Sequence, residues 1–272
     1  MESYLLGAIA GDCCGAYYEF GKERTKNYND VVLVKRQNRF TDDTVCTIGV
    51  ADAILKYGNP TIDQFRDSIQ EWCKKYPNRG YGGKFRDWIK NPVPYGSWGN
   101  GSAMRVSACG LVAKSEEEAH ELAIHSAECS HNTPEARLGA SVIARAIYFA
   151  KTYEQEVAYE KITELFESAY PEYVDKNLYD IRPKYHFDSS CAGTVPVALL
   201  AFLESEDYED CLKLAISMGG DADTLAAIAG SIAYVYYREM SKDLFNNITN
   251  LLPYDMKQVI KEFDKCVNTI LA

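Results

Sequence analysis

The sequence has no pair of cysteines at the C-x-x-C spacing, although it contains nine cysteines in 272 residues. Closely spaced cysteines are what a thiolate zinc site or a dithiol redox centre needs, so both classes are excluded. Histidine is also scarce, with four residues, and His120 and His125 do not have the spacing of zinc ligands. An odd number of scattered cysteines indicates buried, reduced thiols, which we expect for most of them.

The sequence also has fewer basic than acidic residues, 29 against 39, and it lacks long apolar runs. The formal net charge is −10 and the isoelectric point is about 5.0. This balance argues against nucleic-acid binding and against a polybasic membrane contact. No segment approaches the roughly 20 apolar residues of a membrane span, and Met1–Tyr4 lacks the basic region of a signal peptide. We therefore expect a cytoplasmic protein and a monomer, which binds a small anionic ligand, if any, through backbone N–H groups or a metal.

Alternating strand patterns are missing apart from the short run 31–34, whereas helix periodicity recurs throughout. With 47% apolar residues the chain has enough material for one large core. We predict an all-α fold, one domain over residues 1–272, with function on the connecting loops. The predicted helices are 41–57, 61–75, 103–112, 115–129, 138–153, 154–169, 194–203, 208–217, 224–240 and 255–271, and residues 170–190 are expected to be mostly loop.

Two acidic clusters stand where helices are predicted to begin. Thr41, Asp42 and Asp43 precede one apolar helix, and Asp221, Asp223 and Thr224 precede another. Asp and Thr are favoured at helix starts because their oxygens accept unpaired backbone N–H groups. Six hard oxygen ligands are also what Mg²⁺, Mn²⁺ or Ca²⁺ requires. The spacing alone leaves open whether these residues are two sets of caps or one metal site.

The first 20 residues are rich in glycine and end in an acidic residue. Gly7, Gly11 and Gly15 recur every four residues, which would let one helix face lie against another backbone, although a loop starting at Gly11 is equally compatible. If the helix continued, Asp12 and Glu19 would share a face. Glu19 lies beside aromatic residues, so it is either a partly desolvated carboxylate with a raised pKa or a surface residue that ends a helix.

Two glycine-rich loops follow one another in the middle of the chain. One spans Gly80, Tyr81, Gly82 and Gly83 and precedes a helix start, which favours phosphate binding through backbone N–H groups. The other contains Ser97, Trp98, Gly99, Asn100, Gly101 and Ser102 and leads into the helix that holds Met104. Two such loops in succession suggest a diphosphate or nucleotide. His131, at a helix junction, is a candidate ligand contact or a structural residue.

Taken in order, these motifs resemble those of the ADP-ribosylglycohydrolase family. The resemblance covers nearly the whole chain and rests on GAIAGDCCGAYYEF at 7–20, FTDDT at 40–44, RGYGG at 79–83, WGNGSAMR at 98–105, SHNTPEA at 130–136 and GGDADTLAAIAG at 219–230. It implies an orthogonal bundle of more than ten helices with a two-magnesium cleft. The implied metal ligands are Thr41, Asp42, Asp43, Asp221, Asp223 and Thr224.

The resemblance also implies roles for the loops. Gly80–Gly83 and Gly99–Met104 would hold the diphosphate and distal ribose, His131 would contact the ligand, and Glu19 would be the acidic residue beside the scissile bond. Two departures stand out. Ala222 replaces the middle threonine of the family's usual G-D-T-D-T pattern. The side chain at this position is not expected to bind metal, so no metal ligand is lost. Ser97 occupies a position that is acidic in members resembling the nitrogenase-regulating enzyme, where the acid is proposed to act on an arginine linkage.

The implied activity is Mg²⁺-dependent removal of ADP-ribose from modified proteins by hydrolysis at C1 of the distal ribose, with serine slightly favoured over arginine. Mn²⁺ is an alternative metal. The expected partners are ADP-ribose and an ADP-ribosylated protein. Three other hypotheses stay open: a metal-dependent phosphoesterase, a non-catalytic ADP-ribose-binding or structural protein, and a hydrolase of O-acetyl-ADP-ribose or poly(ADP-ribose).

Overall fold

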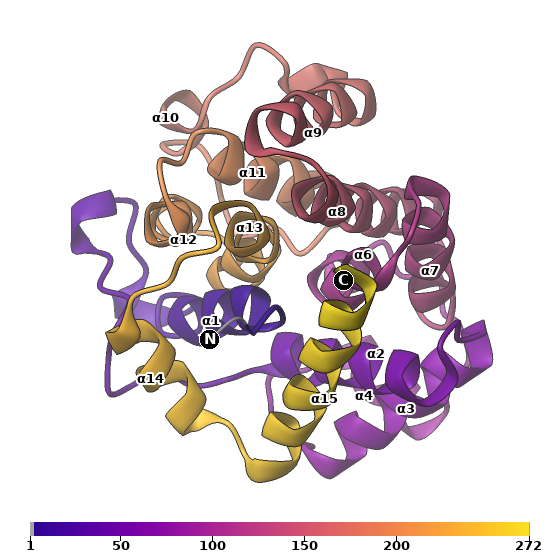
Figure 1. The fold of residues 1–272 in the computed structure, drawn as a ribbon. Coiled ribbons are helices and arrows are strands. Elements are labelled where there is room, and N and C mark those ends of the chain that lie inside the picture. The colour runs from indigo at the N-terminus through magenta and orange to yellow at the C-terminus, as the bar shows by residue number, and fades with distance from the viewer. Residues whose placement is uncertain (1–2, 272) are drawn as a thin grey trace.

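A computed structural model describes residues 3–271, and the regular secondary structure of this part of the chain is helical (Figure 1). No β-strand occurs among these residues, where the β-type pairing is an isolated bridge between Gly99 and Ser190. The predicted all-α class is confirmed. The longer helices are α1 (Leu6–Gly15), α2 (Asp42–Tyr57), α3 (Ile62–Lys75), α4 (Gly83–Lys90), α7 (Glu116–Glu128), α8 (Pro134–Thr152), α9 (Gln155–Ala169), α11 (Cys191–Leu203), α12 (Tyr208–Ile216), α13 (Ala222–Tyr237), α14 (Lys242–Leu251) and α15 (Tyr254–Leu271).

Helices α1 and α13 lie side by side near the centre of the molecule, surrounded by the others (Figure 1). A Cβ atom added to Gly7 would lie 2.7 Å from the carbonyl oxygen of Gly230, and one added to Gly15 would lie 2.4 Å from that of Ala222. Real Cβ atoms do not approach backbone so closely, so only glycine permits this packing. The prediction that the glycine face lies against another backbone is confirmed, and the alternative of a loop starting at Gly11 is wrong.

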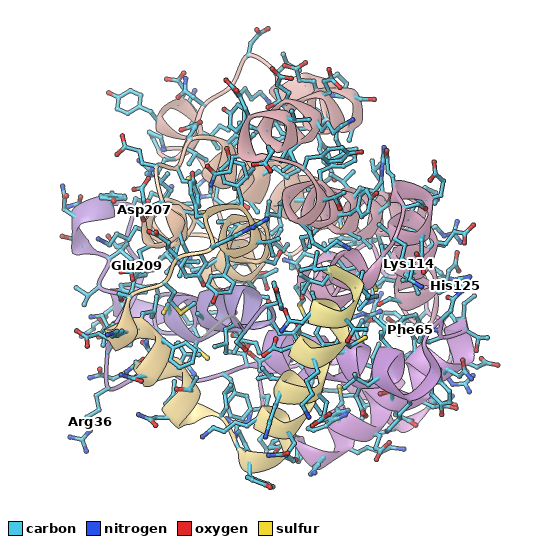
Figure 2. All side chains as sticks on the ribbon, viewed as in Figure 1. Arg36, Phe65, Lys114, His125, Asp207 and Glu209 are labelled. Atoms are coloured by element: carbon cyan, nitrogen blue, oxygen red, sulfur yellow. The ribbon has the colours of Figure 1, made fainter. Side chains whose placement is uncertain are left out.

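The remaining helices complete the core around this pair. Helix α2 packs on α3 and α15, and α8 packs on α6 (Ser107–Val112), α7 and α9. Charged side chains such as Arg36 and Asp207 lie on the outside, whereas Phe65 of α3 is fully buried (Figure 2). Eight of the nine cysteines are buried free thiols, as expected, and Cys266 is partly exposed.

Some helix boundaries differ from the predictions. The predicted helix 103–112 is divided into α5 (Gly101–Met104) and α6, with a break at Arg105 and Val106. Helix α14 was not predicted, although Ser241 caps it and Leu244 and Ile248 form its buried face. The loop at 170–190 contains two short helical segments, η3 (Pro171–Tyr173) and α10 (Leu178–Ile181). None of the described helices is long and apolar enough to cross a membrane.

Candidate metal and ligand site

A cleft of about 470 Å³ brings together the acidic clusters and both glycine-rich loops. Most of the site residues predicted from the sequence line it, namely Glu19, Asp42, Asp43, Gly80, Gly82, Gly83, Ser97, Trp98, Gly99, Asn100, Gly101, Met104, His131, Asp221, Asp223 and Thr224. These residues come from segments more than 200 positions apart in the chain. The cleft has the size of a small-molecule site.

The starts of α2 and α13 face each other across this cleft. At α2 the cap is Thr41, whose hydroxyl accepts the backbone N–H of Asp43, and at α13 no side chain caps the helix. Asp221 instead accepts a hydrogen bond from the amide of Asn100 at 2.7 Å. The capping interpretation therefore does not account for the carboxylates of Asp43 and Asp221.

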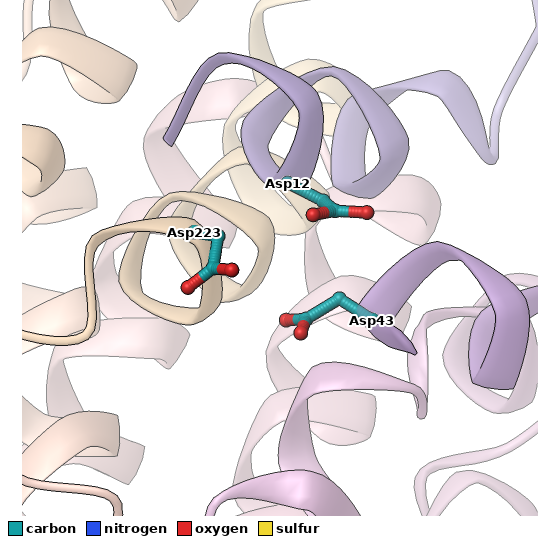
Figure 3. Close-up of side chains that lie close together, drawn as sticks. All are labelled: Asp12, Asp43 and Asp223. Atoms are coloured by element: carbon teal, nitrogen blue, oxygen red, sulfur yellow. The ribbon is translucent and has the colours of Figure 1, made fainter. Parts of the chain in front are cut away.

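A third carboxylate, from α1, joins the two clusters (Figure 3). Carboxylate oxygens of Asp12, Asp43 and Asp223 lie within 4.8 Å of one another, and so do those of Glu19, Asp221 and Asp223. Sequence analysis did not place Asp12 among the metal ligands. The sequence signal for Asp12 was that it would share a helix face with Glu19 if the helix continued. Helix α1 instead ends at Gly15, and Glu19 lies in the following turn.

Asp12 holds the start of α2 in place. Its carboxylate accepts the backbone N–H groups of Thr41 and Thr44 at 2.9 and 3.1 Å, and both threonine hydroxyls also donate to it. Burial raises the pKa of Asp12, and these four hydrogen bonds act in the opposite direction by stabilising its charged form. The Thr41 hydroxyl donates a hydrogen bond to Asp12, so a lone pair of the Thr41 oxygen remains available to accept a hydrogen bond or to bind a cation.

The electrostatics of the cluster fit a bound cation. Burial and neighbouring carboxylates raise the pKa of Asp43 and of Asp223 well above their usual values. Burial and the charge of Asp12 raise the pKa of Asp42 to about 7, and burial raises that of Asp221 to about 6. One oxygen of Asp43 is buried without a hydrogen-bond partner. A divalent cation would satisfy this oxygen and offset the repulsion, so the residues present fit a metal with hard oxygen ligands.

Glu19 lies at the edge of this cluster and is partly buried. Burial and the adjacent charge of Asp223 raise the pKa of Glu19 to about 9. The desolvated-carboxylate interpretation of Glu19 is therefore favoured over the surface interpretation.

The glycine-rich loops form the other part of the cleft. A Cβ atom added to Gly82 or Gly83 would meet no atom within 4 Å, so the backbone at the start of α4 is open to a ligand. Gly99 and Gly101 lie against the ring of His131, whose Nε2 atom would be 2.8 Å from a Cβ at position 101. Exposed N–H groups at a helix start suit an anion.

Three of the predicted site residues lie behind the cleft. Thr41 is hydrogen-bonded to Asp12, Tyr81 donates its hydroxyl to the carbonyl of Tyr76, and Ser102 donates to the carbonyl of Ala136. Further residues line the cleft without having been predicted, namely Phe20, Lys84, Phe85, Tyr95, Gly96, Arg105, Phe187 and Ser189. Those adjacent to the motifs had a sequence signal, but Phe187 and Ser189 come from the loop before α11 and had none.

A model of the protein family described as ADP-ribosylglycohydrolase matches residues 2–262 of this chain. The chain belongs to the ADP-ribosylglycohydrolase family. The family and its relatives are named as ADP-ribosylhydrolases, which are hydrolases of glycosidic bonds. ADP-ribosylhydrolase ARH3 of Bos taurus is 27% identical over 310 residues, covering 86% of this chain and 83% of that protein. ADP-ribosylarginine hydrolase Tri1 of Pseudomonas putida is 23% identical over 258 residues, covering 86% and 69%.

A solved structure shares the fold. The protein described as an ADP-ribosylglycohydrolase-related protein complex superposes with a TM-score of 0.73 at 22% identity, covering 97% of this chain and 96% of that one. The resemblance stated from the motifs is thus confirmed for the family and for the fold.

Proposed function

We propose that this protein is a Mg²⁺-dependent ADP-ribosyl-acceptor hydrolase that cleaves the bond at C1 of the distal ribose and releases ADP-ribose from modified protein side chains. The observation that carries the proposal is that the two acidic helix starts and the two glycine-rich loops line one cleft. A cation-binding end next to an anion-binding end matches a ligand with a ribose on one side and a diphosphate on the other.

The metal ligands in this proposal are Thr41, Asp42, Asp43, Asp221, Asp223 and Thr224, which would hold two Mg²⁺ ions, with Mn²⁺ as the alternative. When bound, such ions hold the ribose hydroxyls and make a water molecule more acidic. Asn100 keeps Asp221 oriented through its amide, and Asp12 keeps Thr41 oriented through its carboxylate. Partners of this kind fix the direction of ligand side chains.

Glu19 is the proposed general acid. Burial is the largest cause of the raised pKa of Glu19 and favours its protonated form, which can donate a proton to the leaving oxygen of the acceptor as the C1–O bond breaks. The glycine-rich loops bind the diphosphate away from the reacting carbon. Binding energy of that kind holds C1 in position for attack by water.

A serine linkage is favoured by the neutral residue at position 97. The hydroxyl of Ser97 accepts the backbone N–H of Gly99 at 3.2 Å. The acidic residues that line the cleft are Glu19 and the four aspartates at the helix starts, so the described cleft offers no further carboxylate to pair with a guanidinium. An oxygen-linked acceptor needs no such partner.

The test compares two peptides of the same sequence, one ADP-ribosylated on serine and one on arginine, each with Mg²⁺ and with EDTA. We expect Mg²⁺-dependent release of intact ADP-ribose, faster from the serine peptide. Release of AMP or phosphate would instead identify a phosphoesterase. ADP-ribose binding without release from either peptide would identify a binding protein or another acceptor, and absence of both would overturn the proposal.

A further inference from the structure

A buried chain of hydrogen bonds connects Arg105 to His131 through Ser130. Arg105 lies at the break between α5 and α6, has no exposed surface, and donates from Nη2 to the hydroxyl of Ser130 at 3.0 Å. The Ser130 hydroxyl lies 2.7 Å from Nδ1 of His131. No carboxylate among residues 3–271 forms an ion pair with this guanidinium, and its Nε and Nη1 atoms are buried without partners. Neither Arg105 nor Ser130 was among the site residues predicted from the sequence.

The donors and acceptors in this chain determine where the protons lie. A guanidinium only donates, so Ser130 must use a lone pair toward Arg105. The single proton of the Ser130 hydroxyl then has two neighbours, Nδ1 of His131 at 2.7 Å and the Cys129 sulfur at 3.9 Å. If Nδ1 carried a proton and donated to Ser130, the hydroxyl proton would be left with the distant thiol. A buried donor without a good acceptor is costly, so the hydroxyl donates to Nδ1.

The other ring nitrogen of His131 faces the glycine loop. A Cβ atom at Gly101 would lie 2.8 Å from Nε2, and one at Gly99 would lie 3.6 Å from it. Both glycines line the cleft together with His131. Burial and the charge of Arg105 lower the pKa of His131 well below its usual value, so the ring is neutral. A neutral ring whose Nδ1 accepts must carry its proton on Nε2.

We propose that Arg105 and Ser130 are positioning residues that hold His131 as the neutral Nε2–H tautomer, which donates one hydrogen bond to an anionic oxygen of the ligand at the glycine loop. The positive charge of Arg105 beneath this part of the cleft favours an anionic oxygen over a hydroxyl. In the proposed function this oxygen belongs to the diphosphate of ADP-ribose, and only the identity of the ligand rests on that function.

The tautomer is measured by ¹⁵N NMR of the histidine rings in the free full-length protein at neutral pH, with His131→Gln to assign the signal among the four histidines. We expect a protonated Nε2 and an unprotonated Nδ1. Ser130→Ala should give a mixture of tautomers, and Ser130→Thr, which keeps the hydroxyl, should restore the wild-type pattern. Ser126→Ala is the matched control, because the Ser126 hydroxyl is buried four residues away and makes no hydrogen bond. A protonated Nδ1 in the wild type, or an unchanged tautomer in Ser130→Ala, would overturn the proposal.

The second measurement concerns the ligand. We expect ADP-ribose to shift the Nε2 signal of His131, and Ser130→Ala to weaken ADP-ribose binding about 3- to 10-fold by calorimetry, while Ser126→Ala binds like the wild type. Binding of ADP-ribose without any change at Nε2 would contradict the donor role. If ADP-ribose does not bind at all, the proposed function fails. Inorganic pyrophosphate then serves as the probe, and an unshifted Nε2 signal at saturating pyrophosphate overturns the donor role independently.

Discussion

The Cβ atom that Gly11 lacks would lie 2.1 Å from the carbonyl oxygen of Ala226, so α1 and α13 meet backbone to backbone. Asp12 follows Gly11 directly, and Asp223 lies one helical turn before Ala226. The close approach of the two helices therefore also sets the separation of two carboxylates in the cluster. Packing and the candidate metal site depend on the same contact.

Gly11→Ala should destabilise the protein by about 3 kcal/mol, because a methyl group would have to displace the backbone of α13. The melting temperature should fall by roughly 10 °C. Gly83→Ala is the control, since a Cβ there meets no atom within 4 Å. It should melt within a few degrees of the wild type and yet bind ADP-ribose more weakly, because Gly83 lines the cleft. Equal stability of Gly11→Ala and the wild type would show that the helices are farther apart.

Asp43→Asn and Asp223→Asn should each lower Mg²⁺-dependent release of ADP-ribose by at least about 100-fold. Without metal these variants should be as stable as the wild type or more stable, because each removes one charge from a crowded cluster. Addition of Mg²⁺ should then raise their melting temperature less than that of the wild type. Asp63→Asn, an exposed position on α3, is expected to behave like the wild type in both assays. Full activity of Asp43→Asn in EDTA would contradict the metal mechanism.

The metal-free protein should lose stability as the pH rises from about 5 to 9. Folding raises the pKa of Asp221 to about 6, of Asp42 to about 7 and of Glu19 to about 9. At these three groups the folded state keeps protons that the unfolded state has lost, so their contribution makes the free energy of unfolding decrease with pH. The lowered pKa values of His131 and Lys151 act in the opposite direction, but they are fewer than the carboxyl groups with raised pKa values. Thermal unfolding in EDTA across this range measures the slope, which Glu19→Gln should reduce at its alkaline end. A melting temperature that rises over this range would contradict the crowding of these carboxylates.

Asp12→Asn should weaken Mg²⁺ binding about 10- to 100-fold. Asp12 does not line the cleft, and its carboxylate is hydrogen-bonded to Thr41 and Thr44. The amide replaces one acceptor oxygen with a donor that faces Thr41 and Thr44, so stability should also fall by about 2–4 kcal/mol. Asp52→Asn is the matched control, because Asp52 of α2 also accepts a hydrogen bond from another helix, the indole N–H of Trp72 on α3. That variant should lose stability without any change in Mg²⁺ affinity, which calorimetric titration measures. An unchanged Mg²⁺ affinity in Asp12→Asn would show that Asp12 does not orient the site.

Local signals predicted most of the helices because their causes are local. Thr61 and Gln64 form the capping box of α3, and Pro134 occupies the first turn of α8. The break at Arg105 had no such signal. Arg105 leaves the helix where its guanidinium reaches the carbonyl of Ser126 and the hydroxyl of Ser130, which are tertiary contacts.

The sequence by itself determined the fold class, the family motifs and the ligand chemistry of the site, since apolar periodicity, helix caps and hard oxygen donors are properties of residue types and their spacing. Only the tertiary structure decided which of these groups meet. It brought Asp12 into the acidic cluster, placed Thr41, Tyr81 and Ser102 behind the cleft, and connected Arg105 to His131. The physical reason is that distances between side chains on different helices depend on how closely the helices pack, and for Asp12 and Asp223 that is the contact of α1 with α13.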